Sequence, residues 1–290
     1  MSKEIKRELL ICPKCKNNNL VFIDNKIICA CGSLFSYSAS NKTDENKYYF
    51  VSYNEGNVTD FLDKIKYKFK RFSKFYNFLI TLISPVYPFN LRLRRFIKKF
   101  ITGEGDNSIA LNIGSGNTNL GENISNIDIY KYENVDLTAD LSNLPIKDES
   151  VDVIINSAVL EHVPFPEEAV LEFNRILKKD GVIYCFFPFM QGFHASPYDF
   201  SRRTIEGLKI LFKDFKILEL RDAQGPTSGF LWVFQEWLAI LLSFGIKPLY
   251  LILHLIIMLI TFPLKFLDFL LIKHPMGKNI TSGFIVIARK

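Results

Sequence analysis

The stretch Ala110-Leu-Asn-Ile-Gly-Ser-Gly-Asn-Thr118 decides the fold of this 290-residue chain. A short apolar run from Ile109 to Ile113 ends there in Gly114-Ser115-Gly116. Apolar residues followed by paired glycines predict a buried strand that turns sharply against a ligand, because glycine lacks a Cβ and permits positive φ angles. A lone G-x-G motif also occurs in ordinary tight turns, so its meaning depends on the segments that follow it.

Those segments repeat the pattern of a short apolar strand followed by polar residues. Ile127-Asp128-Ile129 is a second apolar strand that carries an acid, and Asp140 stands before a turn that ends at Pro145. Val151–Ile155 is a third strand, and Leu160-Glu-His-Val163 follows it. Strands that alternate with helical segments predict a parallel α/β sheet. Ligands of such sheets bind at the carboxyl ends of the strands, so we expect the glycines and both acids at one edge.

This order of motifs resembles the class I S-adenosylmethionine-dependent methyltransferases, in particular the subgroup with LPF and LEHV motifs. The resemblance implies a Rossmann-like, mostly parallel seven-stranded sheet. Asn112 stands where the family usually has Asp, and Thr118 where it usually has a third glycine. The stretch between Gly116 and Asp128 is too short for a full crossover helix and a strand, so we expect the first helix to be reduced to a turn. The matching segments are Leu111–Gly116, Asp128, Asp140–Ile146, Val151–Ile155, Leu160–Val163 and Arg175–Gly181.

The resemblance also implies a cofactor, S-adenosylmethionine, and places residues around it. Gly114 and Gly116 would lie under its methionine part, and Asp128 would accept hydrogen bonds from the ribose hydroxyls. Asp140 would accept from the adenine amino group, with Leu141 against the ring. Alternatively each acid is a surface turn residue, and His162 satisfies the core. The predicted cofactor-binding residues are Asn112, Gly114, Ser115, Gly116, Asp128, Asp140, Leu141 and His162.

The substrate is expected in the loop Phe189–Arg203, which follows the predicted strand Val182–Pro188. Loops at that end of a sheet carry function more often than packing. Histidine as a residue type is suited to proton transfer near neutral pH, so His194 can remove a proton from an acceptor hydroxyl or amine. Asp199 and Arg202 can orient it or hold an anionic group. The predicted catalytic residues are therefore His194, Asp199 and Arg202. The alternative is a loop that folds on itself through an Asp–Arg pair.

Four cysteines near the N-terminus predict a metal site. Cys12-Pro-Lys-Cys15 is a C-x-x-C turn, and Cys29-Ala-Cys31 follows a small hairpin expected around Asp24-Asn25. Four thiolates from two tight turns suit a closed, structural Zn²⁺ site, so Cys12, Cys15, Cys29 and Cys31 are the predicted ligands. A small β module with reduced cysteines and no metal is the alternative. Segment 1–47, which ends in a polar linker, is similar to short zinc ribbons that precede some methyltransferases, including an RNA-modifying group.

Residues 48–107 are predicted to form a basic, aromatic helical arm. Lys64–Phe75 holds six basic and four aromatic residues and no acid, and Arg92–Phe100 adds five basic residues. Cationic segments on both sides of an apolar stretch are typical of an interfacial membrane element. The alternative is a pair of helices that packs on the catalytic domain, and basic aromatic segments also suit single-stranded RNA.

The methyltransferase core is predicted at 108–222 and 283–290, with an apolar helical insertion at 223–282. Phe230–Ile246 contains one charged residue, Glu236, and Pro248–Leu264 contains no Asp, Glu, Lys or Arg. Crossing a membrane takes about 20 apolar residues, so neither stretch crosses comfortably. Because the strands on both sides belong to one sheet, the chain must return to the same side. We expect a hairpin in the membrane interface; a buried cap or a dimer surface is the alternative.

The whole chain favours contact with anionic surfaces, since it is 48% hydrophobic and carries a formal charge of +6. No signal peptide is recognisable at the N-terminus, so we expect a cytoplasmic protein at the inner face of the membrane. The expected reaction is methyl transfer to an oxygen or nitrogen of a small-molecule or lipid-linked acceptor: a lipid, a quinone or a lipid-linked sugar. Alternatives are an RNA methyltransferase, with nucleic acid the less favoured partner, and a non-catalytic scaffold that binds cofactor or membrane.

Overall fold

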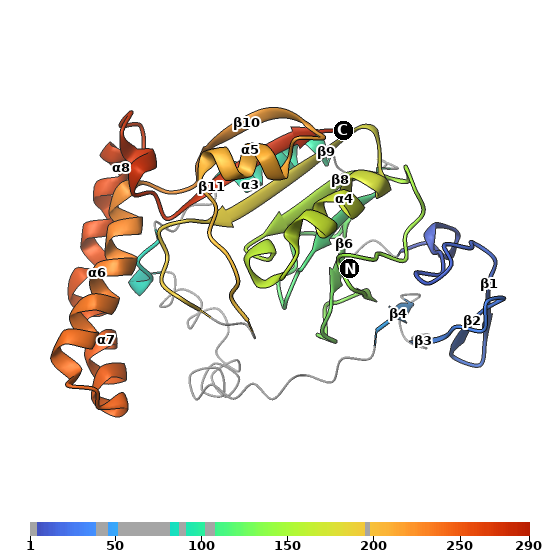
Figure 1. Cartoon of the computed structure of the whole chain (residues 1–290), viewed down its shortest axis with the longest axis horizontal. Coiled ribbons are helices and arrows are strands. Elements are labelled where there is room, and N and C mark those ends of the chain that lie inside the picture. Colours follow the sequence, from blue (N-terminus) through green and yellow to red (C-terminus); the bar gives the residue numbers. More distant parts are fainter. Residues whose placement is uncertain (1–4, 39–45, 52–81, 87–90, 102–107, 195–197) are drawn as a thin grey trace.

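The computed structural model describes residues 5–38, 46–51, 82–86, 91–101, 108–194 and 198–290 (Figure 1). Within these residues the strands join into one mixed sheet of eleven, in the order β1-β2-β3-β4-β7-β6-β5-β8-β9-β11-β10. The strands are β1 Leu20–Ile23, β2 Lys26–Cys29, β3 Leu34–Ser38, β4 Lys47–Tyr49, β5 Ala110–Ile113, β6 Ile124–Asp128, β7 Leu137–Thr138, β8 Val151–Ser157, β9 Leu177–Pro188, β10 Lys216–Asp222 and β11 Gly283–Arg289.

The Rossmann-like α/β core that the sequence predicts is confirmed in its central strands. β5 pairs in parallel with β6 on one side and with β8 on the other, and β9 continues the parallel set beyond β8. β11 then runs antiparallel between β9 and β10. All four residues of β5 and all five of β6 are buried, as expected for parallel strands covered on both faces.

The seven-stranded sheet predicted from the sequence is wrong in extent, because the N-terminal segment extends the same sheet. β1, β2 and β3 form an antiparallel set, and β4 pairs in parallel with β7. The amide of Tyr48 donates to the carbonyl of Asp136 (2.9 Å), and that of Phe50 donates to Thr138 (3.0 Å). Tyr48 is completely buried. The domain boundary predicted at residue 47 therefore falls at the first residue of β4.

Two smaller expectations about local structure are confirmed. The hairpin around Asp24-Asn25 is present, with φ angles of 48° and 61° at these residues, which suit a two-residue turn between right-twisted strands. The first helix is missing between β5 and β6: residues 114–123, all of which the structure describes, contain turns only. Instead, the amides of Gly114 and Ser115 both donate to the carbonyl of Ile127 (2.8 and 3.0 Å).

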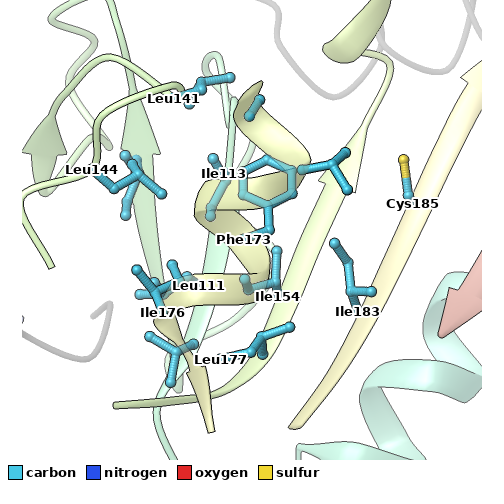
Figure 2. Packing of buried hydrophobic residues seen from close by; sticks show 14 of the residues in the cluster. Leu111, Ile113, Leu141, Leu144, Ile154, Phe173, Ile176, Leu177, Ile183 and Cys185 are labelled. Carbon is cyan, nitrogen blue, oxygen red and sulfur yellow. The ribbon is translucent and has the colours of Figure 1, made fainter. Parts of the chain in front are cut away.

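Helices cover both faces of the central sheet. Side chains of successive β5 residues point to opposite faces: Leu111 and Ile113 pack with α4 (Pro166–Ile176) and α5 (Ile205–Leu211), and Ala110 packs with α3 (Leu91–Phe100). Figure 2 shows Leu111, Ile113 and Phe173 in the first of these clusters. In α3, Phe96 lies against Tyr184 of β9 (ring centroids 5.4 Å apart). The other parts of the predicted arm, 52–81, 87–90 and 102–107, lie outside the described residues.

The insertion before β11 is a helical hairpin of α6 (Pro226–Ser243) and α7 (Lys247–Thr261), at the left of Figure 1. The helical segments η4 (Phe262–Leu267) and α8 (Asp268–Leu271) continue α7, and η5 (Gly277–Asn279) precedes β11. The helical run 247–271 is long and apolar enough to cross a membrane, by length and composition. This run is longer than the apolar stretch noted in the sequence.

Asp268 closes the hairpin. Its buried carboxylate accepts hydrogen bonds from the amides of Thr227 (2.7 Å) and Ser228 (2.9 Å) in the first turn of α6. The hydroxyl of Ser228 donates to the same carboxylate (2.6 Å). A carboxylate at a helix N-terminus satisfies free amides and the positive end of the helix dipole. The end of the insertion is thereby joined to its beginning.

Arg175 of α4 holds the segment that carries Asp140 and Leu141. Its guanidinium donates to the carbonyls of Leu144 (3.0 Å) and Ile146 (2.7 Å) and to the carboxylate of Glu172 (2.7 Å). Burial raises the pKa of Glu172, but the hydrogen bond and the positive charge of Arg175 lower it by more. The pKa of Glu172 therefore lies below its usual range.

We predict that Arg175→Leu lowers the free energy of unfolding by about 2–3 kcal/mol, because it leaves the carbonyls of Leu144 and Ile146 without their donor and removes the closest cation from the half-buried carboxylate of Glu172. Denaturant unfolding measures the change. Since the pKa of Glu172 is lowered in the folded state, the stabilisation is complete above about pH 4.3 and is lost as pH falls through the folded-state pKa. The difference in the free energy of unfolding between wild type and variant should therefore become smaller at acidic pH. The control Lys209→Ala breaks an exposed pair with Glu206 and should cost at most about 0.5 kcal/mol; equal losses would contradict the prediction.

Candidate functional site

The glycine loop after β5 is fastened to the end of β6 by Asp128. The amide of Gly116 donates to Oδ2 of Asp128 (2.7 Å), and the amide of Tyr130 donates to Oδ1 (2.9 Å). Burial raises the pKa of Asp128, and these backbone hydrogen bonds oppose that shift. Gly116 has a φ of 52°, and a Cβ built on it would meet no atom of the described chain within 4 Å. The loop therefore presents an open face where a ligand can approach the backbone, which fits a cofactor site.

The other residues of this loop have structural partners. Gly114 has a φ of 74°, and a Cβ on it would lie 2.4 Å from Cγ2 of Val159, so packing alone requires glycine there. Nδ2 of Asn112 donates to Oδ1 of Asn126 (3.0 Å) and to the carbonyl of Thr118 (3.4 Å). The residue that replaces the family's usual Asp thus ties β5 to β6 and to the end of the loop. Ser115 is buried.

Asp140 and Leu141 reach the same edge through β7. Asp128 and Thr138 are register partners in neighbouring parallel strands, so the segment after β7 lies beside the end of β6. Asp140 is exposed, and its Oδ1 accepts a hydrogen bond from the amide of Ser142 (2.9 Å), while Leu141 is buried. The structure therefore brings the ends of β5, β6 and β7 together, as the sequence predicts for a parallel sheet.

A second group of polar side chains forms after β8 and β9. Glu161, in the short helix η3 (Leu160–His162), is completely buried, and its two oxygens accept no hydrogen bond from the described chain. Its Oε1 lies 3.7 Å from Nε2 of His162 and 4.0 Å from Nε2 of His194. Burial raises the pKa of Glu161 to about 7. Glu161, His162 and His194 are called the Glu–His cluster below. His162 thus lies beside His194, and its predicted role in cofactor binding stays a prediction.

The loop that carries His194 is held by an ion pair between Asp199 and Arg202. The guanidinium donates to both carboxylate oxygens (2.5 and 2.7 Å), and the amide of His194 donates to Oδ2 of Asp199 (2.9 Å). Burial raises the pKa of Asp199, but the bonds from Arg202 and His194 lower it more. The amide of Phe200 donates to the carbonyl of Glu161 (2.8 Å) and anchors the loop on η3. Residues 195–197 of the loop lie outside the described residues.

Helix α6 of the hairpin forms another wall of this group. The indole of Trp232 stacks on the imidazole of His194, with ring centroids 6.2 Å apart and an angle of 27°. A Cβ on Gly192 would lie 4.0 Å from Cγ of Glu236. The sequence contained a signal for Glu161, which belongs to the Leu160–Val163 motif, but its role was not predicted. For Trp232 there was no local signal, because the contact joins two distant segments.

The four N-terminal cysteines come together as their spacing predicts. Sγ of Cys12 lies 3.7 Å from Sγ of Cys31, and Sγ of Cys15 lies 3.5 Å from Sγ of Cys29. All four sulfur atoms lie within 4.8 Å of one another. Zn–S bonds of about 2.3 Å in a tetrahedron place sulfur atoms roughly 3.8 Å apart. The thiol positions therefore fit one tetrahedral ion.

Comparison with known proteins points to one enzyme class. Residues 109–185 match the model of a family described as a methyltransferase domain. The match runs from β5 into β9 and so contains both the glycine loop and Glu161. No curated protein matches the chain.

Three solved structures illustrate the similarity. A putative sarcosine dimethylglycine methyltransferase from Galdieria sulphuraria shares 15% identity over 69% of this chain and 82% of that chain, with a TM-score of 0.41. The 1,6-didemethyltoxoflavin-N1-methyltransferase of Burkholderia thailandensis was solved with 1,6-didemethyltoxoflavin and S-adenosylhomocysteine. It shares 11% sequence identity over 93% of this chain and 98% of that chain, with a TM-score of 0.41. A complex of the Trm112 methyltransferase activator and a putative methyltransferase from Haloferax volcanii shares 18% over 45% and 70%, with a TM-score of 0.35.

Proposed function

From the methyltransferase-domain match over residues 109–185 and the open glycine loop, we propose that the chain is an S-adenosylmethionine-dependent methyltransferase. Its proposed acceptor is an oxygen or nitrogen of a molecule held in the membrane: a lipid, a quinone or a lipid-linked sugar. The observation that supports this proposal is that α6 contacts the Glu–His cluster and also exposes apolar side chains to the outside. Trp232 of this helix packs on His194, while Trp237 and Ile240 of the same helix are more than half exposed. An acceptor that arrives along the apolar hairpin would therefore reach the Glu–His cluster directly.

On the cofactor side, the proposed contacts follow the ends of β5, β6 and β7. Gly116 leaves the backbone open to the methionine part, and Asp128 accepts hydrogen bonds from the ribose hydroxyls with the lone pairs that its amide partners do not use. Leu141 packs against the adenine, and Asp140 accepts from its amino group. When bound, S-adenosylmethionine supplies the methyl group on a sulfonium that leaves as a neutral thioether.

On the acceptor side, we assign His194 as the base that takes the proton of the nucleophilic hydroxyl or amine. Its Nδ1 faces the carbonyl of Gly192 (3.1 Å), so Nε2 is the atom directed at the centre of the Glu–His cluster. Nε2 can take the proton of an acceptor hydroxyl or amine. Asp199 and Arg202 act as positioning residues, because their ion pair and the bond to the His194 amide hold the loop in place.

The hairpin is proposed to lie in the membrane interface. Its exposed side chains include Phe244, Ile260 and Leu270, which are 84%, 71% and 72% exposed. Apolar patches of this kind mark interaction sites. Strands β10 and β11 flank the hairpin and pair with each other, so the chain has to return to the same side and a single crossing does not fit. Eleven basic residues between Lys64 and Lys99, with no acid among them, would attract anionic lipid.

The four cysteines are proposed to hold a structural Zn²⁺. A site filled by four thiolates has no open position for chemistry. Its effect would be on folding, because β1 to β4 continue the sheet of the core. The ion would therefore stabilise strands β1 to β4 and, through the pairing of β4 with β7, the segment that carries Asp140.

We predict that Gly116→Asn abolishes cofactor binding and methyl transfer. Asn tolerates positive φ, so the variant folds, and its side chain occupies the open face of the loop. Calorimetry should show no saturable binding to the variant, so its affinity falls by far more than the tenfold that about 1.4 kcal/mol represents. With methyl-labelled cofactor, wild type should label a membrane lipid fraction and the variant none. The matched control is Gly245→Asn, where φ is 78° and space is also open. Label found only in RNA or protein fractions would contradict the lipid acceptor.

We predict about one Zn²⁺ per purified, reduced chain, because four thiolates make one tetrahedral site. Elemental analysis measures it. Cys12→Ser with Cys31→Ser should lose the ion, while Cys185→Ala, which removes the buried fifth cysteine, should keep it. If freshly reduced wild type carries no metal, the cluster is a metal-free β module.

We predict that wild type floats with anionic liposomes at low and high salt, because apolar insertion, about 25 cal/mol per Å², is not screened as charges are. The triple variant Phe244→Ser, Ile260→Ser, Leu270→Ser should float only at low salt, through the basic arm. The matched control changes Leu34, Leu171 and Ile210, which are also more than half exposed, to Ser and should behave as wild type. Wild type that stays in solution at every salt concentration would leave the hairpin as a cap and remove the main support for a membrane acceptor.

A further inference from the structure

Among the residues that the structure describes, Glu161 has no partner that accounts for its burial. Its side chain is completely buried, and neither oxygen accepts a hydrogen bond from the described part of the chain. Arg202 is the nearby cation, but its Nη2 donates to Asp199 (2.7 Å) and to the carbonyl of Gly192 (3.0 Å). A buried carboxylate without a donor or a counter-charge is strongly unfavourable. Such a carboxyl is either protonated or paired with a positive species, and the groups around it distinguish the two.

The two imidazoles are oriented so that their lone pairs meet at this carboxylate. Nδ1 of His162 faces the carbonyl of Tyr198, and Nδ1 of His194 faces that of Gly192. Because a carbonyl only accepts, each Nδ1 carries the proton and each Nε2 carries a lone pair. Nη2 of Arg202 also lies 3.2 Å from Nδ1 of His194, but both of its hydrogens are already used. Metal-binding histidines are typically held in this way, through a carbonyl on the other ring nitrogen.

From this geometry we propose that Glu161, His162 and His194 bind a divalent transition-metal cation other than the zinc of the cysteine cluster, such as Mn²⁺, Fe²⁺ or Co²⁺. The three ligand atoms lie within 4.8 Å of one another, with Oε1 of Glu161 3.7 and 4.0 Å from the two Nε2 atoms. Metal–ligand bonds of about 2.1 Å in a tetrahedron place ligands roughly 3.4 Å apart, and the two carboxylate–imidazole distances of 3.7 and 4.0 Å lie near that spacing. Two imidazoles and one carboxylate leave coordination positions open for water or substrate.

The chemical role of this cation rests on the proposed function. An acceptor hydroxyl that takes an open position has its pKa lowered by the cation and loses its proton to water. The oxygen lone pair then forms the bond to the methyl carbon while the carbon–sulfur bond breaks, and its electron pair stays on sulfur. In this state the cation activates the oxygen, and His194 is a ligand. The location suits the reaction, since Val159, two residues before Glu161, packs against Gly114 of the cofactor loop.

Manganese(II) tests the site, because it prefers carboxylate and nitrogen ligands and avoids the thiolates of the cysteine cluster. Titration of the full chain, followed by electron paramagnetic resonance, should show one bound Mn²⁺ per chain. Glu161→Gln keeps the shape of the side chain and removes its charge, so it should fold and weaken Mn²⁺ binding at least tenfold. His194→Ala, at a partly exposed position, is a second such variant. The control His274→Ala removes an exposed histidine outside the cluster and should bind Mn²⁺ as wild type does.

The outcomes separate this proposal from the proposed function. Wild type that binds no Mn²⁺, or a folded Glu161→Gln that binds it as tightly as wild type, overturns the metal site; methyl transfer to lipid in that metal-free protein would leave His194 as the proton acceptor. Stoichiometric Mn²⁺ that is lost in both variants supports the site, even if no lipid fraction becomes labelled. Retained calorimetric binding of S-adenosylmethionine by Glu161→Gln would show that the loss of metal is local.

Discussion

Backbone pairing on both sides of β5 is the constraint on which the rest of the structure depends. Buried amides and carbonyls have to be paired, and β5 satisfies its own by lying between β6 and β8. This position puts the glycine loop at the centre of the sheet, where the ends of β6 and β7 flank it. Asp128 and the carbonyl of Ile127 then bind the loop amides directly, which replaces the fastening that a first helix would provide. The open face at Gly116 follows from this arrangement.

The Glu–His cluster depends on a different kind of contact, between segments far apart in the chain. Glu161 follows β8, His194 follows β9, and Trp232 belongs to the hairpin before β11. The Asp199–Arg202 pair and the cap that Asp268 places on α6 hold the two outer segments in position. The hairpin therefore does two things at once: it closes the wall beside the Glu–His cluster, and it exposes apolar side chains on its outer surface.

The N-terminal module belongs to the same β-sheet as the core. β4 extends the sheet beyond β7, and the amide of Ile11 donates to the carbonyl of Pro145 (3.1 Å) next to the segment that Arg175 holds. These backbone hydrogen bonds connect the cysteine cluster to the segment that carries Asp140 and Leu141. A change in the stability of the cluster should therefore affect that segment. A module that looks like a separate domain in the sequence is a continuation of the catalytic sheet.

The sequence by itself determined the features that depend on neighbouring residues. The cofactor edge was predicted from the glycines after an apolar run and the acids after the next strands. The missing helix was predicted from the short distance in sequence between Gly116 and Asp128. The spacing of the cysteines predicted that four thiols lie close together. Only the tertiary structure decided the extent of the sheet, the packing of Val159 against Gly114, the burial of the Glu161 carboxylate beside two imidazoles and the contact of Trp232 with His194. Each of these joins segments that local periodicity cannot relate, because the pairing of distant backbone and the burial of a charge are properties of the folded chain.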